Sequence, residues 1–234
     1  MADDITPDIL LRAYALGIFP MADGRDAVDV HWIDPRMRGV LPLESFHMSR
    51  SLRKALLRGD HCVRIDTAFE QTVRACANRP ETWINKPIFK LYQDLHAKGF
   101  AHSIEVWSQG RLIGGLYGVT LGAAFFGESM FSLRRDASKI ALAWTVHRLR
   151  SGGFSLFDTQ FLTPHLASLG GVEISRATYQ ARLADALEQQ ATFFPQGYAP
   201  YPSLISSSGA SGASGDTSTS GALNPESQDK TQMS

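Results

Sequence analysis

The sequence predicts an α/β protein in which a mainly helical N-terminal part precedes a part built on strands. The chain of 234 residues is 44% hydrophobic, which is enough to bury a substantial core. Apolar residues recur at helical spacing through much of residues 1–101, whereas residues 102–161 contain β-rich runs around a single helix. From Ser206 onward large apolar residues are almost absent, so this stretch cannot offset the entropy of ordering. We therefore expect two subdomains, ending near Tyr201, and a disordered Ser/Gly-rich tail.

The N-terminal part begins with a clearly delimited helix. Thr6 is suited to the N-cap, Pro7 to the first helical position, and Gly17 to a left-handed residue at the end. Further along, two apolar stripes at helical spacing mark core-facing helices; they consist of Phe69, Val73, Cys76 and Ala77, and of Ile88, Leu91, Tyr92 and Leu95.

A helix over "RSLRKALLRG" carries a basic stripe. Its positive side chains fall on one face, opposite three apolar residues, and are Arg50, Arg53, Lys54 and Arg58. A charged stripe most often marks only a solvated helix face. The sharper interpretation is a surface that binds nucleic-acid phosphates. The residues alone leave both interpretations open.

The second half of the chain predicts an antiparallel meander followed by a buried helix and one more strand. Turns at Gln109-Gly110 and Leu121-Gly122 separate three β-rich runs, and Gly114-Gly115 suggests a bulge or a close backbone approach. The helix "DASKIALAWTVHRLRSGG" is apolar around most of its circumference. In the strand "FSLFDTQF", the two-residue period puts Asp158 and Gln160 on one face.

Glu128 stands inside the apolar run "FFGESMF", where a buried lone charge would need a partner. If the strand after the helix returns beside the meander, Glu128, Asp158 and Gln160 border a common cleft. Such a group fits a catalytic site, and it fits equally well a structural hydrogen-bond network.

Composition sets limits on partners. Lys+Arg and Asp+Glu both total 23, so any attraction to nucleic acid must come from a local patch. Cys62 and Cys76 form no metal-ligand or disulfide pattern, the N-terminus is acidic, and no apolar stretch is long enough to span a bilayer. These features favour a cytoplasmic protein without a metal or a membrane partner.

Several motifs, in order along the chain, resemble the bacterial leucyl/phenylalanyl-tRNA–protein transferase family: "GIFPM", "WIDPRMRGVLPLESFHMSRSLRK", "HSIEVW", "GGLYGV", "FFGESMFS", "DASKIAL" and "ASLGGVEISRATY". The resemblance implies a small N-terminal domain and an acetyltransferase-like (GNAT-like) domain with a mixed, largely antiparallel sheet. From this resemblance we place the small N-terminal domain with its basic helix at residues 1–61, the GNAT-like catalytic domain at 62–201 and the disordered tail at 202–234. It also implies transfer of leucine, or phenylalanine or methionine, from aminoacyl-tRNA to the N-terminal Arg or Lys of an acceptor protein, which creates a degradation signal (N-degron).

Residue by residue, the resemblance implies a catalytic set of Asp158, Gln160 and Glu128. Positions that in this family line the aminoacyl pocket or its entrance correspond to Met21, Trp83, Leu116, Phe125, Met130, Leu142 and Phe157. We expect tRNA contacts from the basic stripe and from Arg134 and Arg135, no cofactor, and a monomer.

The chemistry is consistent with these residues, because an aminoacyl ester is already activated and needs mainly positioning and a neutral amine. Asp158 could assist the amine, Gln160 could position Asp158, and Glu128 could complement the cationic acceptor. Two alternatives remain. An acyl-CoA-dependent N-acyltransferase usually has a Gly-rich loop where this chain has "RRDASK". A non-catalytic module that binds tRNA or peptides would not need the Asp158, Gln160 and Glu128 set.

Overall fold

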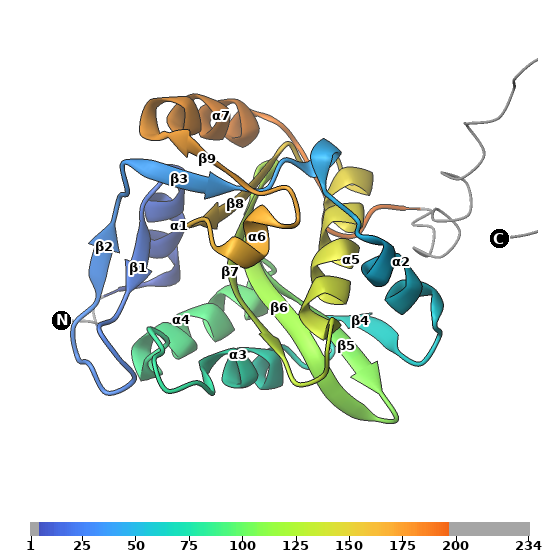
Figure 1. The fold of residues 1–234 in the computed structure, drawn as a ribbon. Helices are drawn as coiled ribbons and strands as arrows, with labels where there is room; N and C mark the ends of the chain where they lie inside the picture. Colours follow the sequence, from blue (N-terminus) through green and yellow to red (C-terminus); the bar gives the residue numbers. More distant parts are fainter. Residues whose placement is uncertain (1–4, 197–234) are drawn as a thin grey trace, which may run out of the picture.

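In the computed structural model, which describes residues 5–196, a central sheet carries helices on both faces (Figure 1). The described strands of this sheet lie in the order β4-β5-β6-β7-β8-β3-β9, and every neighbouring pair is antiparallel except β7 and β8. Their bounds are β3 Met37–Val40, β4 Cys62–Ile65, β5 Ala101–Ser108, β6 Arg111–Leu121, β7 Ala124–Ser132, β8 Leu156–Gln160 and β9 Val172–Ser175. The expected mixed, largely antiparallel sheet is confirmed.

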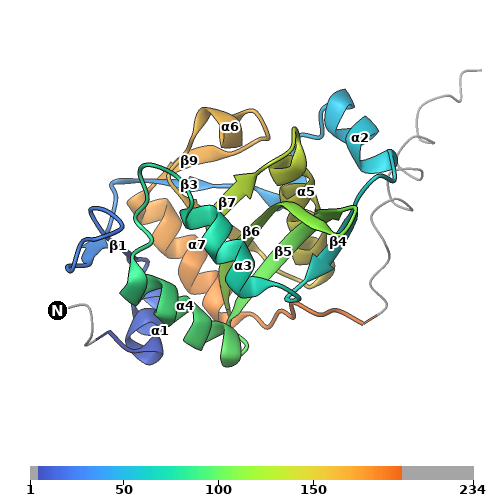
Figure 2. The same cartoon turned by 90° about the horizontal axis from the view of Figure 1, so that it is seen from below.

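Two groups of helices enclose the sheet, as the view from below shows (Figure 2). The first face carries α1 Pro7–Ala15, α3 Phe69–Ala77, α4 Lys86–Ala97 and α7 Arg176–Glu188. The second carries α2 Arg50–Leu57, α5 Ala137–Ser151 and the short helices η2 Leu43–Ser45 and α6 Pro164–Ala167. Neighbouring strand residues alternate between the two cores, with Phe126 in the first and Phe125 in the second. Among residues 5–196, no helix is long and apolar enough to cross a bilayer.

Most of the predicted elements are present. The first helix follows Thr6, whose hydroxyl accepts a hydrogen bond from the backbone N–H of Ile9, and it ends before Gly17, whose φ is +78°. The meander is β5, β6 and β7, the buried helix is α5, and the following strand is β8. Gly114 does permit a close approach, since a Cβ there would lie 2.5 Å from that of Ala137.

Short strands in the N-terminal part were not predicted. The strands β1 Phe19–Met21 and β2 His31–Ile33 form a two-stranded sheet, and β3 and β4 join the large one. Each is three or four residues long, and β3 is held by pairing with β8 and β9 more than a hundred residues away, which no local pattern reveals. The predicted tail, and the predicted end of the fold at Tyr201, lie outside the described residues.

The parallel pair β7 and β8 separates part of the way along its length. Paired positions run from Ala124 with Leu156 to Phe126 with Asp158, and the register ends there although both strands continue. Just beyond this point β7 also has a bulge. In its pairing with β6, Tyr117 lies opposite Ser129 and Gly118 opposite Gly127, so Glu128 is the extra residue. The sheet therefore opens beside Glu128.

Candidate functional site

A cavity of about 330 Å³ lies where β7 and β8 have separated. Its walls come from residues 127–130 of β7, from the end of β8, and from β1, α5 and α6. Of the seven residues expected to line an aminoacyl pocket, the cavity is lined by Met21, Trp83, Leu116, Met130, Leu142 and Phe157. The seventh, Phe125, is buried behind the wall, where its ring packs edge-on against Phe157 with centroids 5.1 Å apart.

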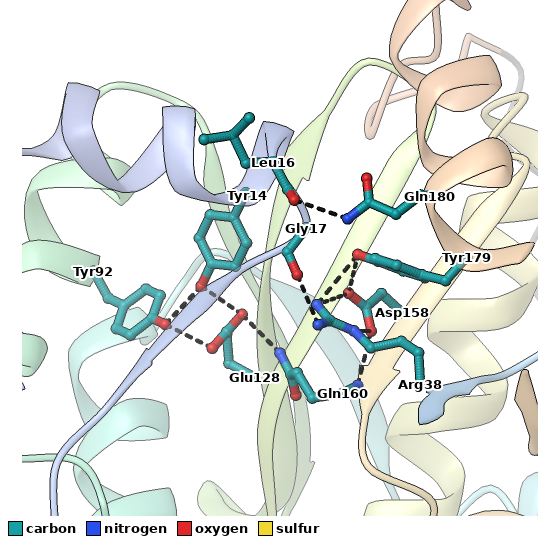
Figure 3. A network of polar contacts seen from close by, with 10 residues as sticks. All are labelled: Tyr14, Leu16, Gly17, Arg38, Tyr92, Glu128, Asp158, Gln160, Tyr179 and Gln180. Carbon is teal, nitrogen blue, oxygen red and sulfur yellow. Dashed lines mark hydrogen bonds and ion pairs between the residues drawn. The ribbon is translucent and has the colours of Figure 1, made fainter. Parts of the chain in front are cut away.

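Glu128 and Gln160 also line the cavity, and they are joined by a hydrogen bond of 3.2 Å from Gln160 Nε2 to Glu128 Oε1. The other partners of Glu128 are two tyrosines (Figure 3). Tyr14 of α1 donates to Oε1 at 2.7 Å, and the hydroxyl oxygen of Tyr92 of α4 lies 2.6 Å from Oε2, within hydrogen-bond distance. Glu128 is therefore paired with side chains from the first helical layer.

Burial raises the pKa of Glu128 to about 7, because the ionised carboxylate loses its hydration. Hydrogen bonds from the two tyrosines act in the opposite direction, and the negative charge of Asp158 raises the pKa further. Neither tyrosine was predicted at the site. Tyr92 was assigned to an apolar stripe, and Tyr14 belongs to a helix whose contact with β7 has no local sequence signal.

Asp158 occupies a separate, fully buried polar cluster. Oδ1 accepts hydrogen bonds from Arg38 Nε at 2.9 Å and from the backbone N–H of Gln160 at 2.8 Å. Oδ2 accepts from Arg38 Nη2 at 2.6 Å and from the Tyr179 hydroxyl at 2.7 Å. The carboxylate is 0% exposed and is not among the described groups that line the cavity.

This arrangement differs from two expectations. Asp158 and Gln160 do not share one environment, because Gln160 has a φ of +58°, which interrupts the strand alternation and brings its side chain to Glu128. In addition, a carboxylate whose two oxygens are occupied by an arginine, a tyrosine and a backbone amide is not placed to contact an attacking amine. Figure 3 shows Gln160 between the two carboxylates, bonded to each.

Arg38 of β3 is a further residue beside the site that the sequence does not predict. It is 1% exposed, its Nη1 donates to the carbonyl of Gly17 at 2.8 Å, and its guanidinium lies over the rings of Phe19 and Tyr179. Burial alone would lower its pKa, but the hydrogen bonds and charge of Asp158 raise it overall. Arg38 is therefore a buried cation that joins β3 to Asp158 of β8 and to the carbonyl of Gly17.

The basic stripe lies on the outer face of α2. Arg50, Arg53, Lys54 and Arg58 are exposed, while Leu52, Ala55 and Leu56 are buried in the second core, which confirms the predicted amphipathic helix. Arg134 and Arg135, the other two residues expected to contact tRNA, differ in their surroundings. Arg134 is 3.1 Å from the carboxylate of Asp60, and Arg135 is 90% exposed. Phosphate binding by these residues stays a prediction.

Three further cavity residues were not predicted, and each has a buried polar atom without a hydrogen-bond partner in the described part of the chain. The atoms are the Tyr117 hydroxyl, Thr159 Oγ1 and His165 Nε2. Unsatisfied buried polar groups are uncommon, so these are candidates for contacts with a ligand. Burial and the charge of Lys139 lower the pKa of His165, which favours its neutral imidazole. Within residues 5–196, no group of three His, Cys, Asp or Glu side chains could hold a metal ion.

The fold is similar to that in the crystal structure of FemX, with a TM-score of 0.50, 13% identity, and coverage of 72% of this chain and 66% of that chain. This likeness concerns the fold alone. The chain therefore has a GNAT-like fold, in which a sheet flanked by helices on both faces opens at its one parallel pair, as the sequence motifs implied.

Sequence comparison identifies the family. A family model described as leucyl/phenylalanyl-tRNA protein transferase matches residues 40–184, and the model of its N-terminal domain matches residues 3–36. A leucyl/phenylalanyl-tRNA–protein transferase of Cereibacter sphaeroides (strain ATCC 17025) is 61% identical over 201 residues, covering 86% of this chain and 94% of that protein. One of Paramagnetospirillum magneticum is 58% identical over 193 residues, covering 81% and 92%. The chain belongs to the leucyl/phenylalanyl-tRNA–protein transferase family.

The buried ion pair predicts a specific pattern of stability. Arg38→Met leaves the Asp158 carboxylate buried without its main partner, so we expect the free energy of unfolding to fall by about 3–5 kcal/mol. Combining Arg38→Met with Asp158→Leu should destabilise less than the sum of the single changes, because no uncompensated charge remains. Urea denaturation measures all three variants.

The matched control is Arg150→Met, which removes an exposed ion pair with Glu44 and should change the free energy of unfolding by less than about 1 kcal/mol. If Arg38→Met and Arg150→Met lowered the free energy of unfolding equally, Arg38 would not be the main partner that stabilises the buried Asp158 carboxylate.

Proposed function

We propose that this protein transfers leucine, and less readily phenylalanine or methionine, from aminoacyl-tRNA to the N-terminal Arg or Lys of acceptor proteins. The observation that carries the proposal is an apolar cavity bordered by Glu128 and Gln160 in a chain of this family. The product is a degradation signal. We further propose that the protein acts in the cytoplasm, as a monomer and without a cofactor.

The donor side of the site is the apolar part of the cavity. Leu116, Met130, Leu142 and Phe157 supply an apolar wall, and a volume of about 330 Å³ is large enough for a leucyl or phenylalanyl side chain with its ester. Methionine side chains fill irregular space adaptably, which suits a pocket that accepts more than one amino acid. Phe125 acts indirectly, by holding the ring of Phe157.

The acceptor side is the polar edge formed by Glu128 and Gln160. An N-terminal Arg or Lys carries a cationic side chain and a basic α-amine, which a carboxyl group and an amide oxygen can both recognise. The Gln160 amide nitrogen donates to Glu128, so the amide oxygen is the group on Gln160 that can accept an N–H of the attacking amine. We assign Gln160 this contact with the substrate.

The reaction is an aminolysis. The neutral α-amine attacks the ester carbonyl carbon, a C–N bond forms, the ester C–O bond breaks, and the ribose hydroxyl of the tRNA leaves with the proton that the amine has lost. The enzyme needs mainly to hold the two reactants in the correct orientation. Asp158 is then a positioning residue, because it fixes the backbone of Gln160 and ties β8 to Arg38 of β3.

Incubation with radiolabelled leucyl-tRNA and an Arg-N-terminal peptide tests the function. We expect label to move into the peptide, and not into the same peptide with an acetylated N-terminus, because aminolysis needs a free amine. A parallel reaction with acetyl-CoA tests the acyl-CoA alternative. Transfer of acetyl but not leucyl groups would contradict the proposal.

The basic stripe supports a second prediction, on tRNA affinity. Changing Arg50, Arg53 and Lys54 together to Glu should weaken aminoacyl-tRNA binding, most strongly at low salt, and should make binding less sensitive to salt. The control variant changes Lys86, Lys90 and Lys98 to Glu; these exposed lysines lie on or directly after α4, on the opposite face of the sheet. Filter binding at several salt concentrations compares the two. Equal losses in both variants would assign the effect to net charge.

A further inference from the structure

Glu128, Tyr14 and Tyr92 form a closed ring of polar contacts in the first core (Figure 3). Tyr14 lies 2.7 Å from Glu128 Oε1, Tyr92 lies 2.6 Å from Glu128 Oε2, and the two tyrosine hydroxyl oxygens are 2.7 Å apart. The two tyrosines are 0% exposed and Glu128 is 8% exposed. All three distances are typical of O–H···O hydrogen bonds.

A count of hydrogen atoms shows what the ring requires. Each of three oxygen–oxygen contacts needs one hydrogen, and the two tyrosine hydroxyls supply one each. Burial raises the pKa of both tyrosines well above 10.0, so both hydroxyls keep their hydrogens. With an ionised carboxylate, one of the three short contacts would bring two oxygens together without a hydrogen. A proton on Glu128 supplies the missing one.

The position of that proton follows from Gln160. Its amide nitrogen donates to Glu128 Oε1, which is therefore the acceptor oxygen, leaving Oε2 to carry the proton. The ring then runs in one direction: Oε2–H donates to Tyr92, Tyr92 to Tyr14, and Tyr14 to Oε1. Chains of hydrogen bonds that run in one direction strengthen one another in a low-dielectric interior.

The two buried charges nearest the ring in this network do not favour an ionised Glu128 on balance, because Asp158 raises its pKa by more than Arg38 lowers it. The buried cation Arg38 of β3 is already paired with Asp158 of β8, so the pair presents little net charge to the ring. Tyr117 of β6 is buried and uncharged, and burial raises its pKa as well. Arg79 lines the cavity, but its guanidinium donates to the Ser129 hydroxyl and to the carbonyls of Cys76 and Met130.

We propose that Glu128 is a neutral carboxylic acid in the substrate-free enzyme, held by Tyr14 and Tyr92, and that a cationic acceptor N-terminus displaces its proton on binding. Tyr14 and Tyr92 are then positioning residues, and the acceptor site is uncharged until an acceptor arrives. The displacement step rests on the proposed function, whereas the resting protonation rests on the ring geometry alone.

The proposal has a definite dependence on pH. A carboxyl group with a raised pKa stays protonated up to about pH 7, so the acceptor must compete with a proton below that pH. Acceptor affinity should rise with pH through this range and then level off. In Glu128→Gln, which has no proton to lose, this part of the pH dependence should be absent.

Infrared difference spectroscopy of the substrate-free protein tests the resting state. We expect a protonated-carboxyl C=O band that persists to about pH 7, is absent in Glu128→Gln, and is unchanged in the control Glu81→Gln, which alters an exposed carboxyl group. Tyr92→Phe removes one ring member and should shift the pH at which the band disappears. A Glu128 band that is already lost near pH 5, as for an ordinary carboxyl group, would overturn the proposal.

Calorimetric titration with an Arg-N-terminal peptide, in buffers that differ in ionisation enthalpy, tests the displacement. Near pH 6 the wild-type protein should release about one proton per peptide more than Glu128→Gln does, and the variant also corrects for protons exchanged by the peptide. Equal release by both proteins would overturn the displacement. A peptide that fails to bind would overturn both the displacement and the proposed function, while the infrared result would still decide the resting state of Glu128.

Discussion

The separation of β7 and β8 beyond Phe126 and Asp158 is the constraint on which the site depends. A continuous sheet would satisfy its backbone groups by pairing and leave no internal space. Where the parallel register stops, the second half of β7 and the end of β8 become the walls of a cavity, and the bulge at Glu128 re-aims the side chains on one of those walls. The cavity therefore exists because of how the strands pair and separate.

Two buried carboxyl groups flank this opening, and they differ in how they are stabilised. Asp158 is fixed by a bidentate arginine, so it holds β3 and β8 together. The hydrogen-bond partners of Glu128 are all neutral groups, so we expect its ionisation to respond to a charged ligand in the cavity. Gln160 is bonded to both groups, through its backbone N–H to Asp158 and through its side-chain amide to Glu128.

The sequence predicts the elements that have a local signal, and it does so well for the second half of the chain. Turn residues and alternation mark the meander, a continuous apolar surface marks α5, and the motifs indicate both the GNAT-like fold and the family. Six of the seven residues that the family resemblance implies for the pocket do line the cavity. Their roles in binding remain predictions.

What the sequence does not predict are contacts between distant segments. Arg38 meets Asp158 only because the four-residue strand β3 pairs beside β8, and Tyr14 and Tyr92 reach Glu128 only because α1 and α4 pack on the same face. The bulge and the positive φ of Gln160 likewise change which side chains share a face, and strict alternation cannot anticipate either.

The most direct test of the account is the single-turnover rate of Gln160→Ala with saturating leucyl-tRNA and Arg-N-terminal peptide. If Gln160 contacts the attacking amine, the rate should fall by about 100-fold or more, while the melting temperature and the affinity for leucyl-tRNA stay close to those of the wild-type protein. A rate near that of the wild-type protein would contradict the claim that the opening between β7 and β8 is where transfer occurs through Gln160.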